Sequence, residues 1–258
     1  MIARFDGATV VVTGAAHGFG RAIALAFVER GANVWACDVL ADSLAETARM
    51  GGAGRDGIMH TRIVDITDRE AVMAFVAEAE ASSASGAVDV LVNNAGGVGG
   101  QVGRPMEEIT PDAWRALFAI NVDAAFAFSQ AVVPGMKRVG SGRIVNISSG
   151  AGLGVSLTGI QAYASAKAAQ IGLTRQLAHE LGRDGITVNN VAPGFVRSNP
   201  TTERQWQSYG EAGQEALLER IAMRRLGTPD DIANAVVFFA SPFAGWVTGQ
   251  VLSVDGGK

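Results

Sequence analysis

Short apolar runs alternate with longer helical patterns along the whole chain, and this alternation most constrains the fold. Runs such as Val10–Val12 and Val90–Val92 contain no polar residue, which is typical of strands covered on both faces, as in a parallel sheet. Strands that alternate with helices predict right-handed crossovers and a doubly wound α/β fold. The predicted strands are Thr9–Thr13, Asn33–Cys37, Thr61–Val64, Val88–Val92, Arg143–Ile147, Ile186–Val191 and Val251–Val254.

The helical patterns between these runs are long enough to flank such a sheet. Two helix starts are well signalled, because a threonine that can act as a cap precedes proline and aspartate at Thr110–Asp112 and at Thr228–Asp230. No linker or shift in composition divides the chain, so residues 1–258 are predicted to form a single domain. The predicted helices are Arg21–Glu29, Leu40–Met50, Arg69–Ala81, Pro111–Arg138, Tyr163–Leu181 and Asp230–Ala240.

One segment, residues 198–225, breaks this rhythm between the strand that ends at Pro193–Gly194 and the last predicted helix. Its Trp206, Tyr209 and Leu217–Leu218 could pack as a helical flap over a crevice. Insertions at the carboxyl ends of parallel strands usually shape the ligand site. We therefore predict a flap that contributes to substrate binding, with an ordinary surface excursion as the alternative.

Composition excludes several classes of function. The net charge of −4 and the scattered basic residues leave no basic surface for nucleic acid. Cys37 is the only cysteine, so an internal disulfide or a CxxC site is impossible. The three histidines show no metal-ligand spacing, so no metal is predicted. The start lacks an apolar signal segment and no run of 18 apolar residues occurs, which predicts a cytoplasmic protein without a membrane partner.

A glycine-rich turn follows the first predicted strand and opens a helix. Gly14, Gly18 and Gly20 allow the chain to turn tightly and to approach a pyrophosphate, with His17 and Phe19 between them. The phosphates then lie at the positive N-terminus of the helix. Glycine triplets alone are weak signals, but the order of strand, turn, helix and second strand predicts a dinucleotide site.

Asp38 follows the second predicted strand, 18 positions beyond Gly20. A carboxylate there can bind both ribose hydroxyls of NAD and repels the 2′-phosphate of NADP. Val39 and Leu40 offer no arginine to receive that phosphate. His17 is the one feature that could help to hold it, although histidine is ordinarily neutral at pH 7. NAD is therefore the predicted cofactor, with NADP as the alternative.

Tyr163 and Lys167 are four residues apart in a predicted helix and therefore share one face. An ammonium beside a phenol favours the phenolate and lowers the tyrosine pKa from its ordinary value of about 10. That makes Tyr163 a candidate acid/base at neutral pH. Taken alone, the pair could equally be a surface tyrosine and a solvated lysine.

The ordered set of motifs resembles the short-chain dehydrogenase/reductase family over nearly the whole chain. The resemblance implies one Rossmann-type domain with a seven-stranded parallel sheet flanked by helices, commonly assembled as a homotetramer. The residues that carry it are Thr13–Gly20, Asn93–Gly96, Asn121, Ser149, Tyr163, Lys167 and Pro193–Gly194.

The resemblance also implies a role for each polar residue of the site. Tyr163 is the general acid/base, and Lys167 binds the nicotinamide ribose and lowers the pKa of Tyr163. Ser149 positions and polarises the substrate oxygen. Asn121 anchors a water that links Lys167 to a proton path.

The position of the serine is ambiguous from spacing. Ser149 lies 14 positions before Tyr163, whereas the usual family spacing falls on Gly150, and Ser148 is adjacent. Alignment from the strand Arg143–Ile147 favours Ser149. A one-residue insertion then lies in the loop 150–159, beside the expected substrate, where it is expected to affect specificity.

Further contacts follow from the resemblance alone. Those to the cofactor are Asp65 and Ile66 at the adenine, Asn93, Ala95 and Gly96 at the adenosine and ribose, and Pro193, Gly194, Val196 and Ser198 at the nicotinamide. Candidate substrate contacts are Ser149, Ser156, Tyr163, Trp206 and Tyr209.

The sequence therefore predicts an NAD(H)-dependent oxidoreductase that interconverts a secondary alcohol and a ketone. A sugar acid, polyol, hydroxy acid or cyclic alcohol is compatible. Arg197 and Arg204 could receive a carboxylate or could simply be solvated. One alternative is an NADPH-dependent 3-oxoacyl-thioester reductase, and another is a non-catalytic dinucleotide-binding sensor or scaffold.

Overall fold

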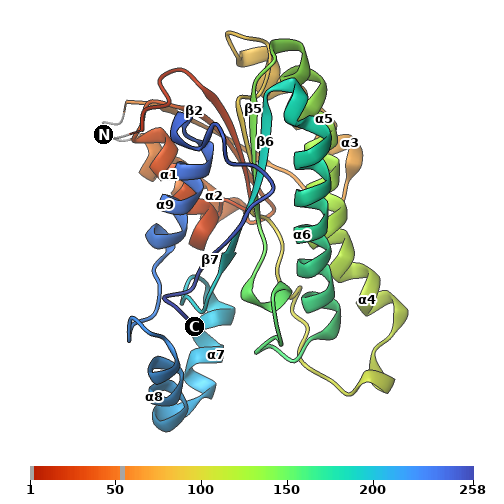
Figure 1. Ribbon diagram of the computed structural model, residues 1–258, viewed down its shortest axis with the longest axis vertical. Coiled ribbons are helices and arrows are strands. Elements are labelled where there is room, and N and C mark those ends of the chain that lie inside the picture. The colour runs from red at the N-terminus through yellow and green to blue at the C-terminus, as the bar shows by residue number, and fades with distance from the viewer. Residues whose placement is uncertain (1–2, 53–55) are drawn as a thin grey trace.

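A seven-stranded parallel sheet lies between two layers of helices in the computed structural model, which describes residues 3–52 and 56–258 (Figure 1). The strand order is β3-β2-β1-β4-β5-β6-β7, so the direction of winding reverses between β1 and β4. Ligands of such sheets bind at this reversal, beyond the carboxyl ends of the strands. The strands are β1 (Thr9–Thr13), β2 (Asn33–Asp38), β3 (Ile58–Ile63), β4 (Val90–Asn93), β5 (Gly142–Ile147), β6 (Ile186–Pro193) and β7 (Val251–Val254).

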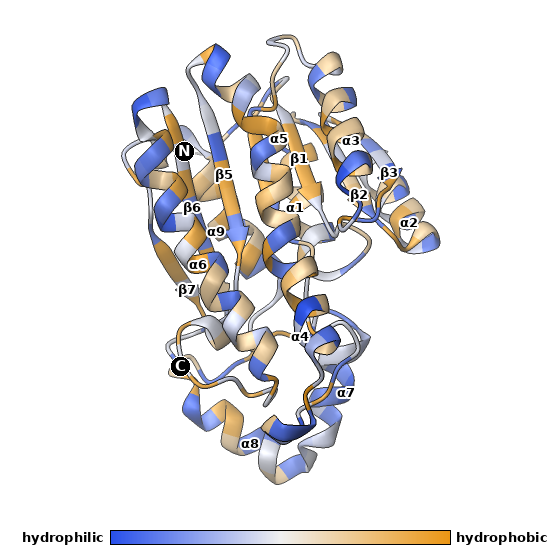
Figure 2. Ribbon diagram, turned by 90° about the vertical axis from the view of Figure 1, so that its right-hand side faces the viewer, coloured by the Kyte–Doolittle hydropathy of each residue, from blue (hydrophilic) through white to orange (hydrophobic). Residues whose placement is uncertain are grey.

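The two helical layers bury opposite faces of the sheet. Because side chains alternate along a strand, Val10 and Val12 pack with α1 and α9 whereas Val11 packs with α3 and α5. Figure 2 shows that β1 is largely hydrophobic, whereas α7 (Pro200–Ser208), which lies outside the sheet, is largely hydrophilic. One layer contains α1 (Gly18–Val28), α2 (Ala41–Gly52) and α9 (Pro229–Ala240), and the other contains α3 (Arg69–Ser82), α5 (Ala124–Val139) and α6 (Gln161–Leu181).

The predicted helix Pro111–Arg138 is interrupted. It consists of α4 (Pro111–Phe118), a π-helical turn (Ala119–Asp123) and α5. A π-turn inserts one extra residue into a helix and is frequent at functional sites. By length and composition alone Pro111–Val139 could span a membrane, but core helices of soluble proteins pass the same test, and half of its apolar window is buried.

Other boundaries differ from the prediction by a few residues. β3 begins at Ile58 rather than at Thr61, because Ile58 pairs with Asn33 of β2. Short 3-10 helices, which the sequence did not predict, cover Met106–Glu108, Gly150–Gly152, Gly182–Asp184 and Pro242–Ala244.

The segment 198–225 contains two helices, α7 (Pro200–Ser208) and α8 (Gly210–Arg220), which project beyond the carboxyl edge of the sheet (Figure 1). Its base is pinned by a parallel bridge between Val196 and Gly227. The backbone N–H of Met223 also donates to the carbonyl of Gly256 at 3.1 Å. The segment is therefore a helical flap with two fixed ends.

Candidate active site

A cavity of about 1210 Å³ lies at the carboxyl ends of the strands, under the flap. Seventeen of the predicted site residues line its wall, and Gly20, Asn93, Asn121, Trp206 and Tyr209 lie outside it. The residues in the wall are Gly14, His17, Gly18, Phe19, Asp38, Asp65, Ile66, Ala95, Gly96, Ser149, Ser156, Tyr163, Lys167, Pro193, Gly194, Val196 and Ser198.

The glycine turn forms a close-fitting cradle at one end of the cavity. Gly14 and Gly18 have φ of +67° and +57°, which side chains other than glycine rarely adopt. A Cβ on Gly20 would lie 2.0 Å from the carbonyl oxygen of Gly14. Gly20 therefore serves helix–strand packing rather than the wall itself. The backbone at the start of α1 lines the cavity at Gly18 and Phe19, where the sequence predicts a phosphate site.

Asp38 is held rigidly at the end of β2. Its Oδ1 accepts the backbone N–H of Val39 at 2.7 Å and of Leu40 at 3.1 Å, and its Oδ2 accepts the N–H of Ala16 at 3.0 Å. A carboxylate offers about four acceptor positions, so one remains for a ribose hydroxyl. Further along the wall, hydrogen bonds from Thr67 lower the pKa of Asp65 below its ordinary value.

The structure corrects the prediction for Asn93. Its side chain is buried away from the cavity, where Nδ2 donates to Oδ1 of Asn146 at 2.8 Å. Asn94 lines the cavity instead, and its Nδ2 donates to the carbonyls of Thr13 and Gly14, each at 3.0 Å. Asn94 thus clamps the glycine turn to the end of β4.

Asn121 lies behind the cavity wall, in the π-turn. Its Oδ1 accepts the N–H of Gly97 at 2.9 Å, and its Nδ2 donates to the carbonyls of Gly97 and Leu117 at 2.9 and 2.8 Å. These bonds occupy both amide protons, so the side chain braces the loop after β4. Its predicted role as a water anchor stays a prediction.

Ser149, rather than Ser148, faces the tyrosine. The hydroxyl of Ser148 is buried and donates to Oδ1 of Asn190. Ser149 hydrogen-bonds Tyr163, and its Oγ also accepts the N–H of Ala151 at 3.1 Å. This geometry supports the alignment from β5.

Burial raises the pKa of Tyr163 above its ordinary value, and the hydrogen bond with Ser149 offsets this only in part. The sequence predicts the opposite direction, from the ammonium of Lys167. That ammonium lies 5.9 Å from the centre of the tyrosine ring and donates to the carbonyl of Ile147 at 2.9 Å. Burial is therefore the larger effect on the pKa of Tyr163.

Burial also lowers the pKa of Lys167 to about 7. The ammonium is penalised in the folded state relative to the unfolded chain, where the lysine pKa is about 10.4. This cost is fully present below pH 7 and fades as the pH rises from 7 toward 10.4. Stability is therefore expected to increase with pH across this window.

Replacing this lysine by the similarly long methionine isolates the effect. The stability of Lys167→Met relative to the native protein should fall by about 2 kcal/mol between pH 7 and pH 9, because only the native protein loses a penalised charge. Urea unfolding at both pH values measures this. Lys137→Met removes an exposed lysine and should show no such trend. If the difference in free energy of unfolding between Lys167→Met and the native protein were the same at both pH values, the lowered pKa of Lys167 would be contradicted.

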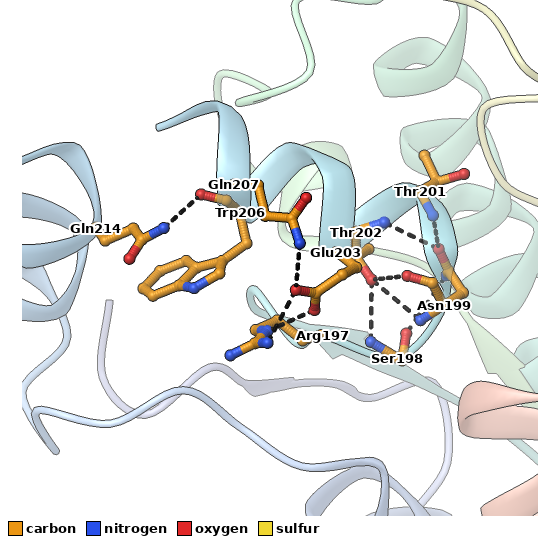
Figure 3. A network of polar contacts seen from close by, with 9 residues as sticks. All are labelled: Arg197, Ser198, Asn199, Thr201, Thr202, Glu203, Trp206, Gln207 and Gln214. Carbon is orange, nitrogen blue, oxygen red and sulfur yellow. Dashed lines mark hydrogen bonds and ion pairs between the residues drawn. The ribbon is translucent and has the colours of Figure 1, made fainter. Parts of the chain in front are cut away.

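The flap is held by a polar network at its first helix (Figure 3). Arg197 binds Glu203 through two hydrogen bonds, of 2.7 and 2.9 Å, and lies over the ring of Trp206 at 5.8 Å. Asn199 caps α7, and Thr202 completes a capping box with it. Arg197 is therefore already paired and is not a free receptor for a carboxylate.

The predicted substrate contacts Trp206 and Tyr209 are corrected. Neither ring lines the cavity wall, and both pack near Phe195, which does, with centroids 6.0 and 5.9 Å away. Gln205 lines the cavity instead, and its Nε2 donates to the hydroxyl of Tyr209 at 2.7 Å. Tyr209 thus orients a residue that the sequence did not single out.

Two cations line the flap end of the cavity. They are Arg220 at the end of α8 and Lys258, and Asp255 lies in the same wall. Burial and the positive charge of Arg220 lower the pKa of Lys258, whereas Asp255 acts in the opposite direction. Arg204 is not among the described residues that line the cavity, and its guanidinium donates a hydrogen bond to the hydroxyl of Thr201 at 3.2 Å.

Comparison with known proteins agrees with this geometry. Residues 14–258 match a family model described as enoyl-(acyl carrier protein) reductase. The chain is also 36% identical to the 3-oxoacyl-[acyl-carrier-protein] reductase FabG of Thermotoga maritima, over 98% of each chain. The protein is a short-chain dehydrogenase/reductase.

Solved structures of this family extend the comparison. One from Beutenbergia cavernae, provisionally assigned as an NAD(P)-dependent gluconate 5-dehydrogenase with bound NADP, has 38% identity and a TM-score of 0.86, covering 98% of this chain and 97% of that one. A 7α-hydroxysteroid dehydrogenase complexed with NADH and 7-oxo glycochenodeoxycholic acid has 35% identity and a TM-score of 0.87, covering 98% and 95%. These confirm the Rossmann-type fold.

As a short-chain dehydrogenase/reductase, the protein is an oxidoreductase of alcohol and ketone groups. Its relatives act on chemically different substrates and bind either NADP or NADH. Family membership therefore fixes the class of reaction, and substrate and cofactor must be argued from this chain's own residues.

Proposed function

We propose that this protein is an NAD(H)-dependent dehydrogenase that interconverts a secondary alcohol and a ketone, with Tyr163 as general acid/base. The observation that carries the proposal is the convergence of Ser149, Tyr163 and Lys167 on one cavity with the glycine cradle and Asp38. A pure binding protein needs the cradle but has no use for a half-buried tyrosine beside a buried lysine, both with pKa values shifted by their surroundings.

The residues divide the chemistry between them. A bound nicotinamide dinucleotide supplies the hydride acceptor for oxidation or the hydride donor for reduction. In oxidation the carbinol carbon loses a hydride while Tyr163 takes the hydroxyl proton; in reduction Tyr163 returns the proton to the carbonyl oxygen. Ser149 accepts from Ala151 through Oγ, so its own proton can hold the substrate oxygen. Lys167 is placed to bind the nicotinamide ribose.

Asp38 supports NAD over NADP. Its carboxylate is fixed by three backbone N–H groups, and a second negative group beside it would be repelled. NAD preference in turn favours oxidation of the alcohol as the physiological direction. The NADH complex of the related hydroxysteroid dehydrogenase is compatible with this preference, whereas the NADP-bound relative represents the alternative.

Arg220 and Lys258 favour an acidic member of the compatible substrates, a hydroxy acid or a sugar acid. They line the cavity wall, whereas the two arginines considered from sequence are bound elsewhere. Asp255, the acidic side chain that shares this part of the wall, accepts backbone N–H groups from Gly257 at 2.9 Å and from Lys258 at 3.4 Å. Two cations against one carboxylate leave a net positive charge for an anionic substrate group.

We also propose a cytoplasmic homo-oligomer, a tetramer by family resemblance. Large apolar side chains are exposed on α5 and around α9, where a second copy could cover them. They are Phe126, Phe238, Phe243 and Trp246. Light scattering of the purified protein tests the oligomeric state.

A panel of alcohols paired by charge tests the substrate class. Each hydroxy acid or sugar acid is compared with its neutral alcohol or polyol, with NAD and then with NADP, by the absorbance of the reduced cofactor. We expect kcat/KM with NAD to favour the acid of each pair roughly 10-fold or more, as for one lost charged contact. Arg220→Ala should remove most of this preference through KM.

Three outcomes would contradict parts of the proposal. Faster turnover of a 3-oxoacyl thioester with NADPH than of any alcohol with NAD would establish the alternative that the Thermotoga maritima relative suggests. Equal activity on acids and neutral alcohols would contradict the proposal that Arg220 recognises an anionic substrate group. Tight NAD binding without turnover of any compound would support a sensor or scaffold.

A further inference from the structure

A buried glutamine lies directly behind Lys167 on α6. Gln170 is three residues further along, and none of its side chain is exposed (0%). Its Oε1 lies 3.4 Å from Nζ of Lys167, and its Nε2 has no hydrogen-bond partner. Neither cofactor binding nor the acid/base chemistry of Tyr163 explains a glutamine at this position.

An unpaired amide nitrogen in the core has a cost. A buried donor without an acceptor loses its hydration, which usually costs 1–3 kcal/mol. Leucine has a similar volume and would fill the same space without an unpaired group. A buried polar side chain that stability alone disfavours is expected to have a compensating role. Among the described residues, the amide of Gln170 is hydrogen-bonded to the side chain of Lys167, so its role is expected to involve that lysine.

The ammonium of Lys167 has three donors and needs acceptors in a buried site. The carbonyl of Ile147, at the end of β5, accepts one at 2.9 Å. Oε1 of Gln170 accepts a second, which leaves one donor for the cleft. An amide facing an ammonium must present its oxygen, and this orientation leaves Nε2 unpaired.

Gln170 is itself anchored to the sheet. Its backbone carbonyl accepts the hydroxyl of Thr174 at 2.9 Å, and that hydroxyl accepts Nδ2 of Asn146 at 2.9 Å. Asn146 lies on β5, the strand that also supplies the carbonyl of Ile147. The backbone of α6 at Gln170 is therefore linked to the strand that supplies the other acceptor of the ammonium.

We propose that Gln170 is a positioning residue for Lys167, whose buried side-chain oxygen holds the ammonium beside Tyr163 at the edge of the cleft. The role rests on the proposed function, because it serves the lysine assigned there. Its test needs no substrate, so the two can fail separately.

In the part of the chain that the structure describes, the charged groups on the helices packed against α6 lie away from this position. The 3-10 helix Gly182–Asp184 carries Arg183, which is exposed, and Asp184, which pairs with Lys137 at 3.5 Å. On α4 and the π-turn, which pack against α6, the charged residues are Asp112, Arg115 and Asp123, and all three are exposed. Burial is the cause of the lowered pKa of Lys167. The remaining titratable groups in the described cavity wall are His17, Asp38, Asp65, Tyr163, Arg220, Asp255 and Lys258.

The lysine content of the chain makes the test direct. The sequence has three lysines, Lys137, Lys167 and Lys258, so NMR of isotopically labelled lysine gives few signals, and Lys167→Met assigns the one of interest. We expect the pKa of Lys167, about 7 in the native protein, to fall further in Gln170→Leu because an acceptor of the charged form is lost. In Gln170→Glu it should rise by about 1 or more, because an opposite charge replaces the amide.

A matched control separates this effect from helix composition. Gln176 lies on the same helix and is exposed, so Gln176→Leu should leave the pKa of Lys167 unchanged. Unfolding by urea completes the comparison, and Gln170→Leu should be at least as stable as the native protein. If Gln170→Leu does not fold, Gln170→Met carries the same comparison.

A residue that only fills space would give the opposite pattern. An unchanged Lys167 pKa in both Gln170→Leu and Gln170→Glu would overturn the proposal, whatever the activity of the enzyme. Changes of the Lys167 pKa in opposite directions in the two Gln170 variants would support the proposal, and loss of turnover in Tyr163→Phe would support the proposed function separately. The protein could also turn over no alcohol while the pKa of Lys167 falls in Gln170→Leu and rises in Gln170→Glu. That result would support the positioning role and count against the proposed function alone.

Discussion

Replacing Tyr163 by phenylalanine is expected to lower kcat roughly 10²- to 10⁴-fold in both directions, the usual contribution of a general acid/base. The change removes one hydroxyl, and the ring keeps its apolar contacts with the cluster of Leu117, Ile160 and Ala162. The fold and the cradle around Gly14 should therefore be intact. Steady-state rates at saturating cofactor, with NADH binding followed by fluorescence, measure the two effects separately.

The second tyrosine provides the contrast. Tyr209→Phe also removes a hydroxyl, but from a ring outside the cavity that holds Gln205 at 2.7 Å. Its effect should fall mainly on KM for the substrate. If Tyr163→Phe kept more than about a tenth of the native kcat, the loss would be too small for a general acid/base. That result would rule out the proposed mechanism.

The sequence located the residues whose position depends on spacing and strand ends alone. Tyr163 and Lys167 share a face of α6 because they are four residues apart, and Ser149 follows β5 directly. Gly14 and Asp38 lie at the ends of two neighbouring parallel strands, which meet at one edge of the sheet. These residues line one cavity, as the motif order implies.

Side-chain direction was not predictable in the same way. Asn93 is the last residue of β4 and still points into the helical layer, whereas Asn94 is the first residue past the strand. A shift of one residue in the strand end decides which of them faces a ligand. The aromatic ring of Tyr209 and its place in the flap predict a pocket residue, but the direction of that ring depends on its packing against Phe195.

The electrostatics of the site also needed the structure. Spacing on a helix shows that a lysine lies near Tyr163, but it does not show how much water the site excludes. Burial raises the pKa of Tyr163 and lowers that of Lys167 to about 7, and neither effect can be read from the spacing of the two residues. The sequence does not predict a role for Gln170 either, because a glutamine on a helix is ordinarily exposed and its burial cannot be read from spacing.

Removing the carboxylate of Asp38 is expected to reverse the preference for NAD. Asp38→Ala leaves three backbone N–H groups, of Ala16, Val39 and Leu40, without the acceptor that they now share. Converging N–H groups form an anion site, and the repelling charge is gone. The 2′-phosphate of NADP can then replace the carboxylate as acceptor.

The size of this change follows from the contacts exchanged. NAD loses a hydrogen bond to a charged group, and NADP gains charged hydrogen bonds, each worth about 1.5–3 kcal/mol. The ratio of the two dissociation constants should therefore move roughly 10²-fold or more toward NADP. Fluorescence titration with NADH and NADPH measures both constants, and thermal unfolding shows whether the turn after β2 is intact.

Asp65 is the matched control, because its carboxylate lies in the same cavity but accepts the N–H and hydroxyl of Thr67 at 2.9 and 2.7 Å. Asp65→Ala should weaken the binding of both cofactors alike and leave the ratio of their dissociation constants unchanged, since the adenine that Asp65 is predicted to contact is common to both. Asp38→Asn separates the effect of charge from that of shape, because it removes the repulsion of NADP but still fills the position of the phosphate. Its ratio of the two dissociation constants should therefore lie between those of the native protein and Asp38→Ala. A folded Asp38→Ala variant that retains the native ratio would place the choice of cofactor elsewhere, with His17 in the glycine turn as the next residue to replace.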